Sequence, residues 1–298
     1  MISLCIKTNK NNVITYLMNN ISKIDLDNIV FIHKHFSKYH NIIVHYLGDN
    51  TSVFYNELSS VLTKCVIDNY EYLIIHNLLL LDYFYFDNED IISIEDNCDF
   101  ILNNSNSSSV LLDKDIDSSI SNEINNRINY LWCSILKYIT YNKSIFLDGF
   151  ITFRTSDYIN CLNNILDFSV NKFIINREYS EFINLLKMYI DSQTPKTDLI
   201  HLVYVNEESI LLDKDKNIIS LTKNNLSVNY LSDITFSSND YALNSLLSLL
   251  PQKIIIHLIS PSDDFINTLK LIFRDIITIC TDCNICQTYR LINTKFSQ

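Results

Sequence analysis

Three cysteines near the C-terminus carry the strongest chemical signal in the sequence. Cys280, Cys283 and Cys286 follow a predicted strand with the spacing Cys-x-x-Cys-x-x-Cys. Thiolates at such short intervals can converge on one metal centre, and both Zn²⁺ and iron–sulfur clusters take thiolate ligands. The fourth ligand would come from elsewhere in the chain, and the candidates are Cys5, Cys133 and His257. The alternative interpretation is that Cys280 is buried in the strand and the other two are ordinary reduced thiols.

A redox role for the pair Cys283 and Cys286 is a further alternative. Reactive dithiols of the Cys-x-x-Cys type place their first cysteine at the N-terminus of a helix, where the thiolate is stabilised. The sequence shows no thioredoxin-like unit that places a helix there, so the patterns favour metal binding over disulfide chemistry at this pair.

Phosphate-binding and hydrolase motifs are excluded by the glycine content. The chain has only 2 glycines, Gly48 and Gly149, and they lie far apart. A Walker loop, a dinucleotide-binding fingerprint and a G-x-S-x-G elbow all need glycines close together. Asp157 and Tyr158 do not form a base and nucleophile pair, because adjacent helical residues point to different faces. We therefore predict no catalytic residue.

Composition predicts a globular protein with an acidic surface. The chain of 298 residues is 47% hydrophobic and 19% charged, with a net charge of −11. The Lys and Arg residues are scattered and the surface repels phosphate, so we expect no nucleic-acid partner. The most apolar stretch, residues 73–81, is too short to span a bilayer. The N-terminus does not resemble a signal peptide, so we expect a cytoplasmic protein whose 8 cysteines stay reduced.

The hydrophobic periodicity predicts a mixed α+β fold. Residues 1–50 form a small βαββ unit, residues 51–195 are mainly helical with a polar loop near 103–109, and residues 196–298 form an α/β region that ends in the Cys-rich tail. Within that last region the pattern of strand, helix and strand is typical of a small parallel sheet.

The helical middle contains two predicted helices between residue 156 and Pro195. The first runs from Ser156 to about residue 173, and the second covers residues 177–191. Apolar residues recur at helical spacing in both. The residues that we expect to be buried are Leu162, Leu166, Phe182 and Leu186.

Residues 149–201 resemble a known family. The segments that carry the resemblance are Gly149-Phe150-Ile151-Thr152-Phe153-Arg154, Asp157-Tyr158, Arg177-Glu178-Tyr179-Ser180-Glu181-Phe182-Ile183-Asn184-Leu185-Leu186, Tyr189-Ile190-Asp191-Ser192-Gln193, Pro195-Lys196 and His201. They are similar to the YtxC family of sporulation proteins. The resemblance implies a cytoplasmic protein of endospore-forming bacteria that is linked to sporulation, and it implies no catalytic residue.

Two functions are consistent with these observations. The leading hypothesis is a noncatalytic interaction or regulatory protein without a cofactor, whose partner is another protein. The candidate partner-binding residues are Arg154, Asp157, Arg177, Glu178 and Glu181. Such charges can equally form ion pairs between helices or a solvated helix face. The alternative hypothesis is a zinc or iron–sulfur enzyme or sensor that uses the C-terminal cysteines.

Overall fold

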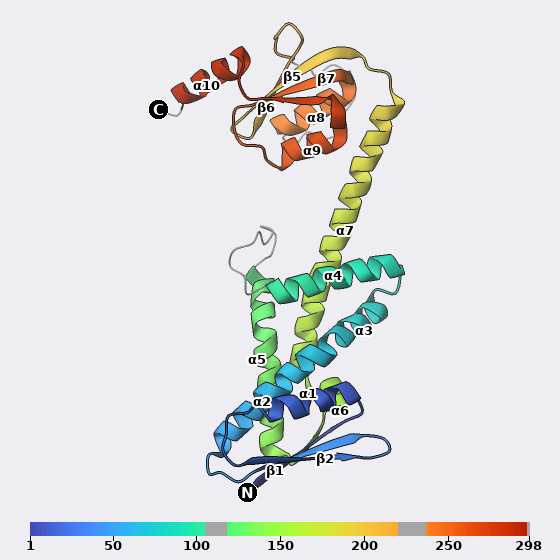
Figure 1. Ribbon diagram of the computed structural model, residues 1–298. Coiled ribbons are helices and arrows are strands. Elements are labelled where there is room, and N and C mark those ends of the chain that lie inside the picture. Colours follow the sequence, from blue (N-terminus) through green and yellow to red (C-terminus); the bar gives the residue numbers. More distant parts are fainter. Residues whose placement is uncertain (105–117, 220–236, 297–298) are drawn as a thin grey trace. The chain divides into compact units, whose positions relative to one another are not determined.

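The computed structural model describes residues 1–104, 118–219 and 237–296 (Figure 1). Residues 105–109 of the predicted polar loop lie outside the described residues. The chain divides into two compact units, which we call unit 1 (Met1–Ile175) and unit 2 (Asn176–Gln298). Helices predominate and each unit contains a small mixed sheet, so the predicted α+β class is confirmed.

Unit 1 begins with the predicted βαββ arrangement. Strand β1 (Ile2–Thr8), helix α1 (Asn11–Ile21), strand β2 (Ile29–His35) and strand β3 (His40–Tyr46) follow one another, and strand β4 (Ser144–Phe146) joins the sheet much later. The strand order is β2-β3-β1-β4, with β4 parallel to β1 and the other pairs antiparallel. The sequence patterns missed β4, because three residues are too short for an alternating pattern.

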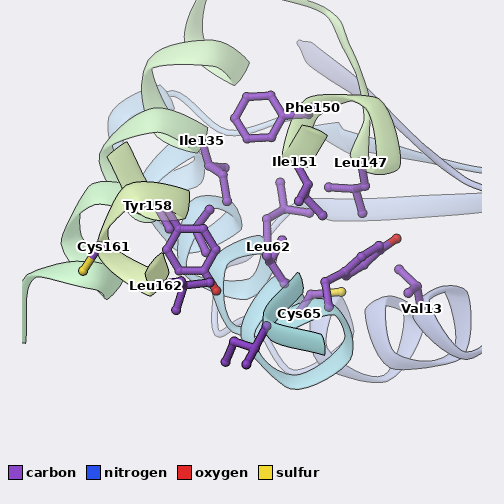
Figure 2. Close-up of a cluster of buried hydrophobic side chains, with 14 of the residues drawn as sticks. Val13, Leu62, Cys65, Ile135, Leu147, Phe150, Ile151, Tyr158, Cys161 and Leu162 are labelled. Carbon is purple, nitrogen blue, oxygen red and sulfur yellow. The ribbon is translucent and has the colours of Figure 1, made fainter. Parts of the chain in front are cut away.

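The helices of unit 1 share one hydrophobic core with its sheet. Besides α1, they are α2 (Thr51–Val66), a π-helical turn (Ile67–Glu71), α3 (Tyr72–Asp82), α4 (Asn88–Asn104), α5 (Ser118–Tyr141), α6 (Leu147–Arg154) and the first part of α7 (Ser156–Ser192). Figure 2 shows part of this core, to which Leu62 of α2, Ile135 of α5 and Leu162 of α7 contribute. No helix in the described part of the chain is long and apolar enough to cross a membrane.

A single long helix, α7 (Ser156–Ser192), replaces the two predicted helices. The prediction of a break near residue 175 was wrong, because no glycine or proline interrupts the segment and polar residues alone do not end a helix. Leu162 and Leu166 are fully buried, as predicted, and Leu186 is half-buried against the core of unit 2. Phe182, however, is 52% exposed, because the buried stripe of this segment runs through Ile183, one residue further along.

Unit 2 is built on a second sheet with the strand order β6-β5-β7-β8. The strands β5 (Thr197–Val205), β7 (Pro251–Leu258) and β8 (Ile277–Cys280) are parallel, and β6 (Glu208–Leu212) is antiparallel to β5. The helices are α8 (Ser238–Leu249), α9 (Asp264–Phe273), a 3₁₀ turn (Arg274–Ile276) and α10 (Asn284–Phe296). The predicted C-terminal α/β region is therefore present, and α10 is an addition to it.

The two faces of this sheet are covered by different helices. Leu202 and Ile256 face a core that includes residues of α8 and α9. Val203 and Leu212 face a smaller cluster that includes Ile285 of α10. Strands of a parallel sheet are normally buried on both faces. Because α8 and α9 pack on one face, α10 covers part of the other. The C-terminal cysteines lie on this α10 face.

Candidate metal centre

Two neighbouring strands and one helix of unit 2 bring four metal-ligating side chains together. His257 lies near the carboxyl end of β7, and Cys280 is the last residue of β8. Parallel pairing places these two residues directly beside each other. The chain then turns through three residues into α10, so that Cys283 immediately precedes the helix and Cys286 lies in its first turn. Residues from two strands and one helix therefore meet at the carboxyl edge of the sheet.

The spacing of the four ligand atoms matches a tetrahedral metal site. His257 Nδ1, Cys280 Sγ, Cys283 Sγ and Cys286 Sγ all lie within 4.8 Å of one another. In a tetrahedral zinc site, metal–sulfur bonds of about 2.3 Å and metal–nitrogen bonds of about 2.0 Å separate two sulfurs by about 3.8 Å, and a sulfur and a nitrogen by about 3.5 Å.

The observed separations are close to these values. The Cys283 and Cys286 sulfurs are 3.7 Å apart, and the Cys280 and Cys286 sulfurs are 3.9 Å apart. His257 Nδ1 lies 3.3 Å from the Cys283 sulfur and 3.4 Å from the Cys286 sulfur. In the described ranges, no other group of three or more Cys, His, Asp or Glu side chains gathers its ligand atoms in this way.

The protonation states in the metal-free protein differ between the four groups. Burial lowers the pKa of His257 to about 4, so its imidazole is neutral near pH 7 and can act as a ligand. Burial raises the pKa of Cys286 to about 12. Burial acts in the same direction on Cys283, but hydrogen bonds from the backbone N–H groups of Cys286 and Ile285 and from the neighbouring thiols outweigh it, so the pKa of Cys283 is lowered.

A second histidine holds the ring of His257 in place. His201, on the neighbouring strand β5, lies with its Nδ1 2.9 Å from His257 Nε2. Both side chains are buried and their rings stack. Because Nε2 of His257 is engaged by His201, its Nδ1 is the nitrogen directed at the thiols. A hydrogen-bond partner on the second ring nitrogen is the usual arrangement for histidines that bind metals.

An open groove adjoins the four ligands. It has a volume of about 780 Å³ and is lined by residues that include His201, Lys216, His257, Thr278, Cys280 and Cys283. Cys286 is fully buried behind it. Sequence patterns did not single out His201 or Lys216 for this site. His201 reaches it through the pairing of β5 with β7, and Lys216 lies in the segment after β6, the strand on the other side of β5.

The structure selects one of the three candidates for the fourth ligand. His257 joins the cysteines, whereas Cys5 and Cys133 belong to unit 1. The thiol of Cys5 donates a hydrogen bond to Asn41, and Cys133 is exposed on α5. The expectation that no helix begins at the pair Cys283 and Cys286 was wrong, because Cys283 immediately precedes α10.

The five candidate partner-binding residues are divided between the two units. Arg154 at the end of α6 and Asp157 at the start of α7 belong to unit 1. The other three residues, Arg177, Glu178 and Glu181, belong to the part of α7 in unit 2. All five side chains are exposed.

The fold and the site define an α+β protein with three cysteines and one histidine gathered at the edge of its C-terminal sheet. Residues 56–278 match the YtxC-like family, and because this match covers most of the chain, the protein belongs to that family. It is also similar to the uncharacterized protein YtxC of Bacillus subtilis (strain 168), with 22% identity over 131 residues, or 44% of this chain. The similar region spans 46% of that relative. No solved structure matches the chain.

Proposed function

We propose that unit 2 is a zinc-binding domain whose ligands are His257 Nδ1 and the sulfurs of Cys280, Cys283 and Cys286. The observation that carries this proposal is the spacing of the four ligand atoms, which is close to that of a tetrahedral zinc site. A single ion fits this spacing better than an iron–sulfur cluster, because a cluster contains several irons and holds its ligands further apart.

The proposed ion has a structural role. Four protein ligands complete a tetrahedron, whereas catalytic zinc sites keep one position open for water or substrate. The ion would connect β7 and β8 to α10, which otherwise contacts the sheet through the small cluster around Val203 and Ile285. A site closed by four protein ligands favours a noncatalytic protein.

Metal content tests this proposal directly. The full chain, purified without added chelator, should carry about one zinc per chain, because four preorganised ligands bind zinc tightly. Cys283→Ser should lose the metal, whereas Cys133→Ser, which changes an exposed cysteine of unit 1, should keep it. His201→Ala should weaken zinc affinity by about 10–100-fold, because the ring of His257 loses its orienting partner. Folded wild-type protein that contains no metal and takes up none on titration would contradict the proposal.

A second candidate function is binding of a protein partner through α7, in the cytoplasm of sporulating cells. The observation that favours it is an exposed apolar stripe in the unit 2 part of this helix. Its members are Tyr179, Phe182, Leu185 and Met188. Large exposed apolar groups beside charges are typical of protein interaction sites, where the charges contribute mostly to specificity. The neighbouring charges include Arg177 and Glu181. The link to sporulation rests on the family resemblance.

Charge reversal on α7 tests the second candidate. Arg177→Glu and Glu181→Lys should change the free energy of unfolding by less than about 0.5 kcal/mol, because both residues are exposed. In a null strain complemented with either variant, spore yield should fall. Lys143→Glu, at an exposed site of unit 1, is the matched control and should sporulate normally. Normal spore yield from both α7 variants at normal protein abundance would argue against a partner at this surface.

A further inference from the structure

The pair Cys283 and Cys286 has the arrangement of a dithiol that exchanges disulfides. Cys283 immediately precedes α10 and Cys286 lies in its first turn, so the motif Cys283-Asn284-Ile285-Cys286 spans the start of the helix. Their sulfurs are 3.7 Å apart. A strand, β8, leads directly into this motif. The N-terminus of a helix, with its unpaired backbone N–H groups, is where reactive Cys-x-x-Cys motifs stabilise the thiolate of the first cysteine.

The two thiols differ in accessibility. Cys283 is half-buried and lines the groove of about 780 Å³, whereas Cys286 is fully buried. A small molecule in the groove can therefore reach Cys283 but not Cys286. The buried thiol is nevertheless adjacent to the accessible one, which is the relation between an attacking and a resolving cysteine. Cys280 also lines the groove, and its sulfur lies 3.9 Å from that of Cys286.

We propose that Cys283 and Cys286 exchange with a low-molecular-weight disulfide bound in the groove and that this exchange releases the metal ion. The release of the ion rests on the proposed zinc site, whereas the exchange itself does not. The volume of the groove is within the range of pockets that hold small ligands, about 300–1,000 Å³. A disulfide of a small peptide thiol is therefore the class of co-reactant that fits.

The reaction proceeds in two balanced steps. The Cys283 thiolate attacks one sulfur of the small disulfide, the sulfur–sulfur bond of that molecule breaks, and one thiolate leaves. The Cys286 thiolate then attacks the Cys283 sulfur of the mixed disulfide, which expels the second small thiolate and forms the Cys283–Cys286 disulfide. The protein dithiol loses two electrons and the small disulfide gains them. Two of the four ligands are then unable to bind, so His257 and Cys280 alone no longer retain the ion.

The experiment treats the zinc-loaded full chain with glutathione disulfide. The Cys133→Ser background is used, because Cys133 is exposed and would react on its own. Zinc release is followed with a chromogenic chelator, and the cysteine products are mapped by peptide mass spectrometry. We expect about one zinc released for each Cys283–Cys286 disulfide formed, and recovery of the bound zinc after treatment with dithiothreitol and Zn²⁺.

Two variants identify the order of attack. Cys286→Ser should accumulate a glutathione adduct on Cys283, because the resolving thiol is missing. Cys283→Ser should lower glutathione incorporation at the remaining C-terminal thiols at least tenfold. Both readouts are masses, so they do not depend on metal binding by the variants.

The outcomes separate the exchange from the zinc site. A metal-free wild-type protein that still forms the Cys283–Cys286 disulfide would support the exchange while contradicting the proposed zinc domain. Zinc-loaded protein that neither releases metal nor forms this disulfide in millimolar glutathione disulfide would overturn the exchange. A first adduct on Cys280 in the Cys286→Ser variant would also overturn it, because the attacking cysteine would then be a different one.

Discussion

Removal of the proposed zinc ion is expected to detach α10 from the sheet of unit 2. Helix α10 carries the proposed ligand Cys286 and begins directly after another, Cys283. Its apolar contact with the sheet is a small cluster around Ile285. Binding of a structural zinc contributes apparent free energies of about 10–16 kcal/mol in small zinc domains, so loss of the ion outweighs what this small cluster supplies. The core beneath α8 and α9 should survive, because it lies on the other face of the sheet.

Hydrogen exchange of the full chain with and without a chelator measures this effect. The backbone amides of α10 (Asn284–Phe296) should lose protection when zinc is removed, while those of α5 in unit 1 should not change. Lower pH should act in the same direction as the chelator, since protons compete with zinc for the three thiolates and metal affinity falls as pH falls. Equal protection of α10 in the two samples would show that the helix is held by its apolar contacts alone.

Loss of Arg127 is expected to destabilise unit 1 by about 3–5 kcal/mol, the usual cost of leaving a buried charge without its partner. Arg127 is only 6% exposed and its Nε lies 3.4 Å from Glu71 Oε2. The hydroxyl of Tyr158 donates a hydrogen bond of 2.6 Å to the same carboxylate oxygen. Arg127→Met keeps the apolar stem and removes the guanidinium. Among the described residues, the buried Glu71 carboxylate then retains only the hydrogen bond from Tyr158.

Urea denaturation measures this prediction. The single tryptophan of the chain, Trp132, lies on α5, so its fluorescence reports on unit 1. Arg154→Met, at an exposed site, is the matched control and should change stability by less than about 0.5 kcal/mol. The double variant Glu71→Leu, Arg127→Met should recover much of the loss, because no unpaired charge is left inside. A loss below about 1 kcal/mol in Arg127→Met would mean that the Glu71 carboxylate reaches water at little cost.

Local patterns in the sequence determined most elements of both units, but not β4, α10 or the continuity of α7. Alternating apolar residues identified β1 and β3, and recurrence at helical spacing identified α2, α5 and the N-terminal half of α7, because burial of one face leaves a period that can be read along the chain. The three cysteines are also brought together by local structure. Ligands three residues apart at the end of a strand are brought near one another by a short turn, whatever the rest of the fold does.

Tertiary structure alone decided the partners of these local features. Phe182 and Ile183 are neighbours in an apolar helix pattern, and only the placement of the unit 2 core buries one and exposes the other. Glu71 and Arg127 are far apart in the sequence, and no local pattern indicates that a buried carboxylate will meet a buried guanidinium.

The fourth ligand shows the same limit at the candidate site. Three residues could have joined the cysteines, and the parallel register of β7 and β8 selects His257 by pairing it with Cys280. The neighbouring strand β5 then supplies His201 behind it. Spacing along the chain brings the three thiols together, because a short turn after β8 is enough to place them near one another. Which imidazole lies beside these thiols depends on the pairing of strands that are far apart in the sequence. The register of that pairing is fixed because both faces of the sheet are buried.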